Sequence, residues 1–527
     1  MADRRARAIM VQGTMSNVGK SVIATGLCRV FAQDGFAVAP FKSQNMALNS
    51  YVTADGGEMG RAQVVQAEAC GLEPTVAMNP VLLKPVTDRG SQVIVAGRAR
   101  GVMSARDYFA TRADLVPDIM AAYDSLAAAH DIVVVEGAGS PAEINLRTDD
   151  IVNMGLARLV GAPVLLVGDI DRGGVFAQLV GTCALLPPDE LALVKGLVIN
   201  KFRGDVTLLA DGLDQLAELT GRPVLGVVPY LDLDLDDEDS LSDRLVGGRP
   251  GAGAGDIAVI RLPKVSNFTD FTALGATAGL TVRYVDAAHD VGSPDLLVLP
   301  GTRNTIADLA WLRARGLDQA VAALARRGGA VVGVCGGYQM LGRSISDPDG
   351  VESGGSGPEG VASGRSDPEG VGSRGSHPEV VESRRTAAGL GLLPVDTTLR
   401  PTKHQTRVSG TVLATAGPLA ALSGAEVAGY EIHQGETRLA PGAAPWLRLA
   451  DGALDGCQQG NVYGTYVHGV FDTASARGAL LTALGLPSGQ APLDYAAHRQ
   501  EQYDHLADAL RAALDIDRVY RIMEVPR

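Results

Sequence analysis

Gly13-Thr14-Met15-Ser16-Asn17-Val18-Gly19-Lys20-Ser21 is the stretch that organises the first half of the chain. An apolar run over 8–11 precedes it, and a helix-like run over 22–31 follows it. A strand, a glycine-rich loop and a helix in this order are the context that a phosphate-binding loop needs. Glycines let backbone N–H groups turn towards phosphate oxygens, and the N-terminus of the helix adds partial positive charge.

The residues of this loop are expected to have different roles in nucleotide binding. Lys20 is expected to neutralise the outer phosphates of ATP, and Ser21 to offer its hydroxyl to Mg²⁺. One more residue separates Gly13 from Gly19 than in the common G-x-x-x-x-G-K-[ST] pattern. The alternative, a tight turn before a buried helix, would leave Lys20 and Ser21 without a role. The predicted ATP contacts in the loop are Gly13, Thr14, Asn17, Val18, Gly19, Lys20 and Ser21.

Six short runs rich in Val, Ile and Leu alternate with helix-like runs along residues 1–230. Such apolar runs are typical of parallel strands that are buried on both faces, and their alternation with helices predicts a doubly wound α/β domain. The runs cover 8–11, 37–41, 131–135, 163–167, 196–199 and 223–228.

Functional residues of such a sheet lie at the carboxyl ends of its strands. Glu136 is placed like a carboxylate that holds Mg²⁺, although a helix N-cap or a solvated loop carboxylate is the alternative. Asp171 follows the next run and can serve a metal or a substrate. Asn200, followed by Lys201, has an amide that can donate to and accept from an adenine edge.

The composition excludes several classes of function. A chain of 527 residues predicts two or three domains. The net charge of −14 and the aromatic content of 4% argue against a nucleic-acid partner. Five scattered cysteines fit reduced thiols in the cytoplasm. The charged N-terminus is unlike a signal peptide and no apolar run is long enough to span a bilayer, so we expect no membrane partner.

A second α/β pattern begins at residue 256, after a stretch over 231–255 that is acidic and then rich in Gly, Pro and Ala. This composition is typical of a domain linker.

In the second pattern, the apolar run 330–334 leads into Cys335, a Gly-Gly turn and a helix-like run, which is the geometry of a nucleophile elbow. The helix N-terminus favours the thiolate. Backbone N–H groups at Gly336 and Gly301 are expected to stabilise an oxyanion, and a buried structural cysteine is the alternative.

Two further segments complete the expected organisation. Four decapeptide units over 346–385, rich in Ser, Gly, Pro and acidic residues, cannot build a core. We expect a disordered insert without a catalytic role inside a second domain over 256–480. The C-terminal segment over 481–527 is helix-like, and it carries an apolar stripe opposite charges of both signs. That pattern favours a docking helix over a membrane anchor.

Several motifs resemble known families. Residues 13–21, 136–140 (EGAGS) and 200–204 (NKFRG) are similar to the dethiobiotin-synthetase-like group of P-loop ATPases, which activates a carboxylate with ATP. The pattern G-x-C-x-G-x-Q, which ends at Gln339, resembles class I glutamine amidotransferases. The runs 43–63, 140–155 and 168–182 resemble the cobyric acid synthase family more particularly. This resemblance implies a flavodoxin-like second domain in which Gln339 helps to bind glutamine.

The resemblance also implies a reaction. ATP and L-glutamine drive amidation of the b, d, e and g carboxylates of (adenosyl)cobyrinic acid a,c-diamide, a corrinoid, to give (adenosyl)cobyric acid in cobalamin biosynthesis. It places Mg²⁺ near Ser21, Asp55 and Glu136, with Glu58 as the alternative to Asp55. Asp149 joins the possible substrate contacts, and the oligomeric state stays open.

The base that assists Cys335 is also assigned by resemblance. His433 and His468 both follow β-rich runs, and the family pattern of a base after a late strand matches His468. The Glu that usually follows two residues later is Val470 here, as in the cobyric acid and cobyrinic acid diamide synthase branch. The residue that orients His468 stays open. Glu431 and Glu436 are candidates, and His433 is an accessory or a structural residue.

Three other functions compete with this interpretation. The nearest is a cobyrinic acid a,c-diamide synthase, since loop composition does not determine which carboxylates react. A partitioning-type regulatory P-loop ATPase shares the phosphate loop, but it has no need for Cys335 and His468. An inactive amidotransferase scaffold would not need to keep both residues.

Overall fold

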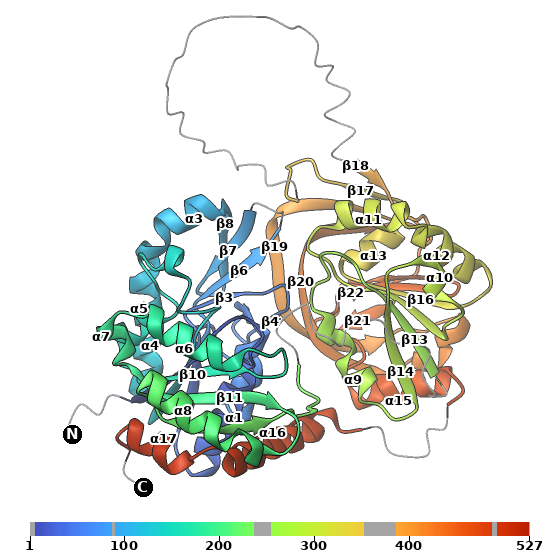
Figure 1. Cartoon of the computed structure of the whole chain (residues 1–527). Helices are drawn as coiled ribbons and strands as arrows, with labels where there is room; N and C mark the ends of the chain where they lie inside the picture. The colour runs from blue at the N-terminus through green and yellow to red at the C-terminus, as the bar shows by residue number, and fades with distance from the viewer. Residues whose placement is uncertain (1–5, 87–89, 237–254, 353–385, 487–492, 526–527) are drawn as a thin grey trace, which may run out of the picture.

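Two α/β domains lie side by side in the computed structural model (Figure 1), which describes residues 6–86, 90–236, 255–352, 386–486 and 493–525. The first domain is built on a six-stranded parallel sheet of order β12-β11-β10-β1-β9-β2. These strands are the six runs predicted from the sequence, and their order confirms a doubly wound sheet. Their bounds are β1 (Arg7–Gly13), β2 (Val38–Phe41), β9 (Ile132–Glu136), β10 (Val164–Asp169), β11 (Val194–Phe202) and β12 (Val224–Pro229).

Helices cover both faces of this sheet because its strands are apolar on both sides. On one face α1 (Lys20–Gln33) contributes Ile23, Leu27 and Phe31 to a buried cluster. On the other face α4 (Val116–Ala129) contributes Ile119 and Tyr123. The remaining helices are α2 (Arg61–Ala69), α3 (Ala105–Thr111), α5 (Met154–Val160), α6 (Val175–Leu185), α7 (Pro188–Leu191) and α8 (Ala210–Thr220).

Between β2 and β9 the chain forms two small sheets that the sequence did not predict, since their strands are short. A four-stranded sheet has the order β3-β6-β7-β8, and β4 pairs with β5. The strands are β3 (Gln44–Met46), β4 (Ser50–Val52), β5 (Glu58–Gly60), β6 (Val81–Pro85), β7 (Gly90–Val95) and β8 (Arg98–Ser104).

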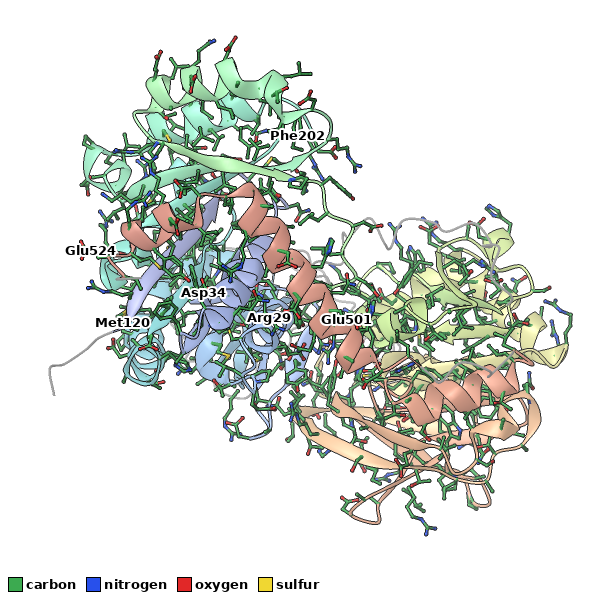
Figure 2. The ribbon with its side chains drawn as sticks, turned by 90° about the horizontal axis from the view of Figure 1, so that it is seen from below. Arg29, Asp34, Met120, Phe202, Glu501 and Glu524 are labelled. Carbon is green, nitrogen blue, oxygen red and sulfur yellow. The ribbon has the colours of Figure 1, made fainter. Side chains whose placement is uncertain are left out.

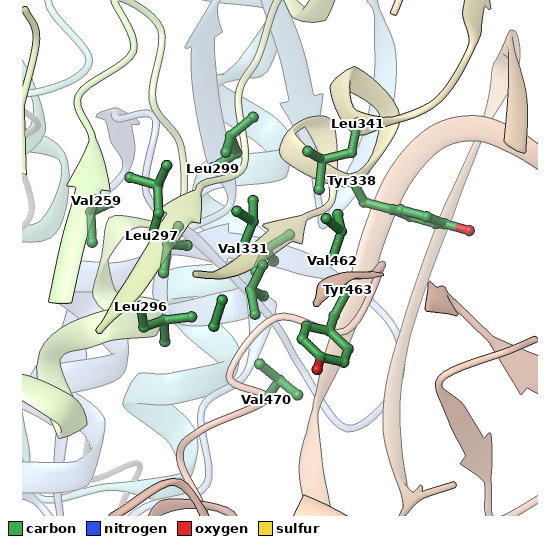
Figure 3. Close-up of a cluster of buried hydrophobic side chains, with 14 of the residues drawn as sticks. Val259, Leu296, Leu297, Leu299, Val331, Tyr338, Leu341, Val462, Tyr463 and Val470 are labelled. Carbon is green, nitrogen blue, oxygen red and sulfur yellow. The ribbon is translucent and has the colours of Figure 1, made fainter. Parts of the chain in front are cut away.

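The second domain has its own six-stranded sheet of order β14-β13-β15-β16-β24-β23, in which only the β23–β24 pair is antiparallel. Figure 3 shows its apolar strands packed against α13 through Tyr338 and Leu341. The strands are β13 (Gly255–Ile260), β14 (Leu280–Val285), β15 (Leu296–Leu299), β16 (Ala330–Val334), β23 (Cys457–Gln459) and β24 (Val462–Thr465). The helices are α9 (Thr272–Gly275), α10 (Ala288–Val291), α11 (Thr305–Ala314), α12 (Leu317–Arg326), α13 (Gly336–Leu341) and α15 (Ala474–Ala483).

A long antiparallel hairpin, β19 (Val395–Val412) with β20 (Glu426–Leu439), arches between the two domains (Figure 1). It belongs to a mixed sheet of the second domain and contacts β4 of the first. The other strands of this sheet are β17 (Ser344–Ser346), β18 (Thr386–Ala388), β21 (Leu447–Leu449) and β22 (Leu454–Asp455).

The C-terminal helices α16 (Tyr495–Ala513) and α17 (Ile516–Ile522) return to the first domain. Figure 2 shows them across that domain, beside Arg29 and Asp34 of the α1 region. Arg29 pairs with Asp504 at 2.7 Å, and Asp34 pairs with Arg511 at 2.8 Å. The apolar stripe is buried in the same cluster as α1; it comprises Tyr503, Leu506, Ala507, Leu510 and Leu514. The segment 481–527 is therefore split, because α15 belongs to the second domain.

The start of the predicted insert is ordered, and this corrects the expectation of disorder from residue 346. Ser346 ends β17, and Glu352 is buried, where it accepts hydrogen bonds from the N–H groups of Thr305 and Ile306. Residues 346–352 of the first repeat unit are therefore part of the folded domain. The rest of the insert, 353–385, lies outside the described residues.

Candidate active sites

Cys335 lies at the turn between β16 and α13 with φ 52° and ψ −110°. Positive φ is rare for a residue with a side chain, and strain of this kind gathers at functional sites. The glycines that follow are required by space. A Cβ at Gly336 would lie 2.7 Å from Thr302 Cγ2, and one at Gly337 would lie 1.9 Å from the carbonyl oxygen of Leu299. The turn at 301–302 and the N-terminus of α13 therefore meet beside the thiol.

His468 is fully buried next to Cys335 and forms a short hydrogen bond with a carboxylate. Its Nδ1 lies 2.7 Å from Oδ2 of Asp270, in the segment between β13 and α9. Burial alone would lower the pKa of His468. The Asp270 carboxylate and the hydrogen bond with Cys335 overcome that effect and raise the pKa to about 10. At neutral pH the ring is an imidazolium, which stabilises a thiolate on its neighbour.

The cavity beside Cys335 is lined by residues from both domains. Thr302, Arg303 and Gln339 come from the second domain, and Lys84 comes from β6 of the first. Gln339 is held in place because its Oε1 accepts from Thr305 Oγ1 at 3.0 Å and its Nε2 donates to the Tyr466 hydroxyl at 3.2 Å.

Glycine is required at position 301 because the ring of His468 packs closely against it. A Cβ at this position would lie 2.9 Å from Cε1 of His468. The glycine therefore allows the ring to approach the turn. Its neighbour Thr302, with Gly336, lines the cavity at Cys335, which is where the predicted oxyanion donors are needed.

The two acidic residues that the sequence offered as partners of His468 are bonded elsewhere. Glu431 lies 3.0 Å from His404, and Glu436 pairs with Arg400 and Arg438. The position of Asp270 corrects this expectation. The sequence carries no local signal for it, because 198 positions separate Asp270 from His468.

His433 lines the cavity at Cys335 but is held by other groups. Its Nδ1 lies 2.8 Å from the Gly435 carbonyl, and its ring stacks on Tyr466 with centroids 3.7 Å apart. Burial lowers the pKa of His433 to about 3, so the ring is neutral. The carbonyl oxygen of Ile432, its neighbour, lies 3.7 Å from Cys335 Sγ.

The phosphate loop forms a second site at the carboxyl end of β1. Lys20 donates to the carbonyl oxygens of Met15 at 3.0 Å and Gly139 at 3.1 Å, so it spans the loop and the turn after β9. Ser21 Oγ donates to Glu136 Oε1 at 2.8 Å. Lys42, directly after β2, is buried and pairs with the same carboxylate at 2.9 Å. Cations and a carboxylate thus meet where the phosphates of a nucleotide would lie.

The donor set around Glu136 fits Mg²⁺ because a hydroxyl and a carboxylate oxygen already meet there. The structure brings together Ser21 and Glu136, two of the three predicted ligands. Asp55 instead lies exposed in the turn between β4 and β5, where it accepts from Thr53. This turn contacts β19 through Gly56 and Gln405, and the assignment of Asp55 as a metal ligand stays a prediction.

The alternative ligand, Glu58, also serves another part of the molecule. It is buried at the domain boundary between Lys84, 2.9 Å away, and Lys403 of β19. Burial would raise the pKa of Glu58, but the two lysines overcome that effect and lower it. In this structure Glu58 is therefore a charged link between the domains, and its role as a metal ligand stays a prediction.

The remaining predicted residues have different surroundings. Asn200 donates to the Val18 carbonyl at 2.8 Å and Lys201 to that of Asn17 at 2.6 Å, so both lie against the phosphate loop. Asp171 pairs with Arg203 at 3.1 Å. Asp149 lies in the loop before α5 with φ 56°.

The segment 266–271 joins the thiol site to the first domain. Asn267 Oδ1 accepts from the Ser50 N–H of β4 at 3.1 Å, and its Nδ2 lies 3.5 Å from His468 Nε2. Thr269 Oγ1 donates to Asn49 Oδ1 at 3.2 Å. One short segment therefore contacts both nitrogens of His468 and the first domain.

Comparisons with known proteins match both domains. Residues 9–240 match the family model described as the CobQ/CobB/MinD/ParA nucleotide binding domain. Residues 256–476 match the model of the CobB/CobQ-like glutamine amidotransferase domain. Their order along the chain is the order of the two sheets.

Curated relatives match over nearly the whole chain. The cobyric acid synthase of Ruminiclostridium cellulolyticum is 49% identical over 98% of this chain and 97% of its own length. That of Lachnoclostridium phytofermentans is 47% identical over 98% and 99%, and that of Yersinia enterocolitica is 48% identical over 98% and 98%.

Proposed function

The chain belongs to the cobyric acid synthase family, and from that premise we propose that its two active sites work in series on one corrinoid. Family membership makes it a glutamine-dependent amide ligase of cobalamin biosynthesis. The first domain is its ligase domain and the second its glutaminase domain. We infer that the acceptors are the b, d, e and g carboxylates of the a,c-diamide, and that the reaction takes place in the cytoplasm. Among the described helices, none is long and apolar enough to cross a membrane.

The observation that carries the glutaminase mechanism is the alignment of Asp270, His468 and Cys335. The imidazolium stabilises the Cys335 thiolate, which attacks the side-chain amide carbon of glutamine. The N–H groups at Gly336 and at the 301–302 turn stabilise the oxyanion. His468 donates its proton to the leaving ammonia, and Asp270 holds the ring in the correct orientation. Water then hydrolyses the thioester, with His468 as base.

The ligase step needs charge neutralisation and alignment. Transfer of the γ-phosphoryl group of ATP to a corrinoid carboxylate gives an acyl phosphate, from which ammonia displaces phosphate. Lys20 and Lys42 are placed to offset the charge of the phosphates. Ser21 and Glu136 would hold Mg²⁺, which neutralises charge on the transferred group. Asn200 and Lys201 brace the loop from β11.

The proposed reaction is tested by mass spectrometry of cobyrinic acid a,c-diamide incubated with the enzyme, Mg²⁺, ATP and glutamine. Four successive conversions of a carboxylate to an amide are expected. No conversion of the diamide, together with conversion of cobyrinic acid at a and c, would support the diamide synthase instead.

Two variants test the division between the sites. Cys335→Ser should lose glutamine-supported amidation and keep ammonia-supported amidation. Lys20→Ala should lose amidation with either nitrogen source. If Cys335→Ser also loses the ammonia-supported reaction, the assignment of separate sites is wrong.

A further inference from the structure

The glutaminase domain carries a cluster of metal-ligating side chains that neither half-reaction uses. His404 of β19 and Glu431 and His433 of β20 offer three ligand atoms within 4.8 Å of one another. We propose that these residues form a binding site for a divalent cation of the zinc class, separate from the Mg²⁺ site of the ligase domain.

The hairpin places the three side chains on one face. His404 and His433 are opposite one another in the β19–β20 register, and Glu431 lies two residues before His433, hence on the same face of β20. His404 Nε2 lies 3.0 Å from Glu431 Oε2. Zinc ligands at about 2.0–2.2 Å from the ion lie roughly 3.3 Å apart in a tetrahedron. Two of the ligand atoms are already near that separation.

His433 is oriented as a metal-binding histidine is. Its Nδ1 is engaged by the Gly435 carbonyl at 2.8 Å, and stacking on Tyr466 fixes the ring plane. Nε2 is then the nitrogen left to bind a cation. A carbonyl on the other ring nitrogen is the usual outer partner of a metal-bound histidine.

The surroundings leave room for a fourth ligand. All three residues line a cavity of about 440 Å³, which also contains Thr437 and Asp455. Glu431 is 7% exposed, so its carboxylate has lost most of its hydration and gains by binding a cation. Two imidazoles and one carboxylate suit zinc, cobalt or nickel rather than magnesium or calcium.

The test is a titration of full-length Cys335→Ser enzyme with Co²⁺, followed by displacement with Zn²⁺. Removal of the reactive thiol keeps it from competing for the metal. The expected result is one equivalent of Co²⁺ with the intense visible absorption of a tetrahedral site, lost on addition of Zn²⁺. His404→Ala and Glu431→Gln should each weaken binding at least about tenfold.

A matched control is His289→Ala, which removes an exposed histidine that also lies beside a carboxylate, Asp290. It should leave Co²⁺ binding unchanged. His404 has an exposed side chain, so its removal is compatible with folding, and the melting temperature checks this. Absence of the tetrahedral spectrum, or equal affinity in folded His404→Ala and its parent, would overturn the proposal.

Discussion

At the scale of single residues, His468, the proposed catalytic base, depends on a carboxylate that lies far from it along the chain. Asp270 lies 2.7 Å from His468 and is the main cause of its raised pKa, against the opposing effect of burial. An ordinary histidine, with a pKa near 6.5, would be largely neutral at neutral pH. The Asp270 contact therefore decides the protonation state in which catalysis begins.

Asp270→Asn is expected to lower the kcat of glutamine-dependent amidation by about 10²- to 10⁴-fold, since the proton donor is lost. Ammonia-dependent amidation serves as the internal control and should be unchanged. The alkaline limb of the glutaminase pH profile should move from near pH 10 towards neutral. An unmoved limb would show that Asp270 does not set the charge of His468.

The same pair makes stability depend on pH. Between pH 6.5 and about 10 the folded protein holds a proton that the unfolded chain has lost. The stabilisation is complete below pH 6.5 and disappears as the pH rises through 10. The melting temperatures of wild type and Asp270→Asn should therefore differ most at about pH 6.5 and converge near pH 10. A constant difference would contradict the pKa assignment.

The sequence predicted those site residues whose immediate neighbours along the chain form a recognisable motif. Lys20 and Cys335 each follow an apolar strand and precede a helix, so their neighbours reveal them. Asp270 has no such signal, because its partner is brought to it only by the fold. The position of Asp55 could not be predicted, because a turn between short strands cannot be placed from composition.

At the scale of elements, Glu352 connects the short segment that follows β17 to the N-terminus of α11. Its carboxylate accepts from two backbone N–H groups, at Thr305 and Ile306, and it lines the cavity at Cys335. Carboxylates at a helix N-terminus stabilise it through unsatisfied N–H groups and the helix dipole.

Glu352→Ala should cost about 0.5–2 kcal/mol of stability and reduce glutaminase activity, because α11 carries Thr305, the partner of Gln339. Joining residues 352 and 386 through a short Gly-Ser linker is the matched comparison, and it should keep both activities. Steady-state assays with glutamine and with ammonia measure both. A similar loss in the two variants would mean that 353–385 contributes to the site.

The parallel strands of the two large sheets were predictable because they are continuous apolar runs. The hairpin β19–β20 was not, since its 18-residue and 14-residue strands alternate polar and buried positions and face the other domain. The formation of partly buried strands of this kind depends on packing against neighbouring strands more than on the β-propensity of their residues. As a result, the surface that carries His404 and His433 emerged only from the fold.

Helix α16 belongs to the core of the ligase domain, and Leu510 is its fully buried anchor against α1. Leu510→Ala should lower the unfolding free energy of that domain by about 2–5 kcal/mol through the cavity that it leaves. The exposed Leu208→Ala is the control and should stay within about 0.5 kcal/mol. Chemical denaturation monitors both. Equal losses of unfolding free energy in the two variants would mean that α16 does not belong to the core of the ligase domain.

At the scale of the whole molecule, the glutaminase site is completed by the ligase domain. Lys84 lines its cavity, and the Ser50 N–H holds Asn267 beside His468. Glu58 and Lys403 add a buried ion pair across the same boundary. Removing one partner of such buried contacts leaves the other unsatisfied, so the boundary is costly to open.

Asn267→Ala removes the link between β4 and His468 and should reduce glutaminase kcat about tenfold, in line with the cost of roughly 1–3 kcal/mol for an unsatisfied buried group. Thr269→Val breaks the neighbouring contact with Asn49 without touching His468, and it should have the smaller effect. The ammonia-supported rate reports on the ligase site. Unchanged glutamine turnover in both variants would show that contacts across the domain boundary do not affect the glutaminase site.

The return of α16 and α17 to the first domain sets the order in which the protein can be assembled on the ribosome. The strands of the ligase sheet are synthesised first, yet the face that receives Leu506 and Leu510 stays uncovered until the glutaminase domain has been translated. The first domain to emerge is thus the last to be completed. A gene divided in the linker would yield an N-terminal product with an exposed apolar face, whereas a glutaminase fragment excised at both ends would carry its own core.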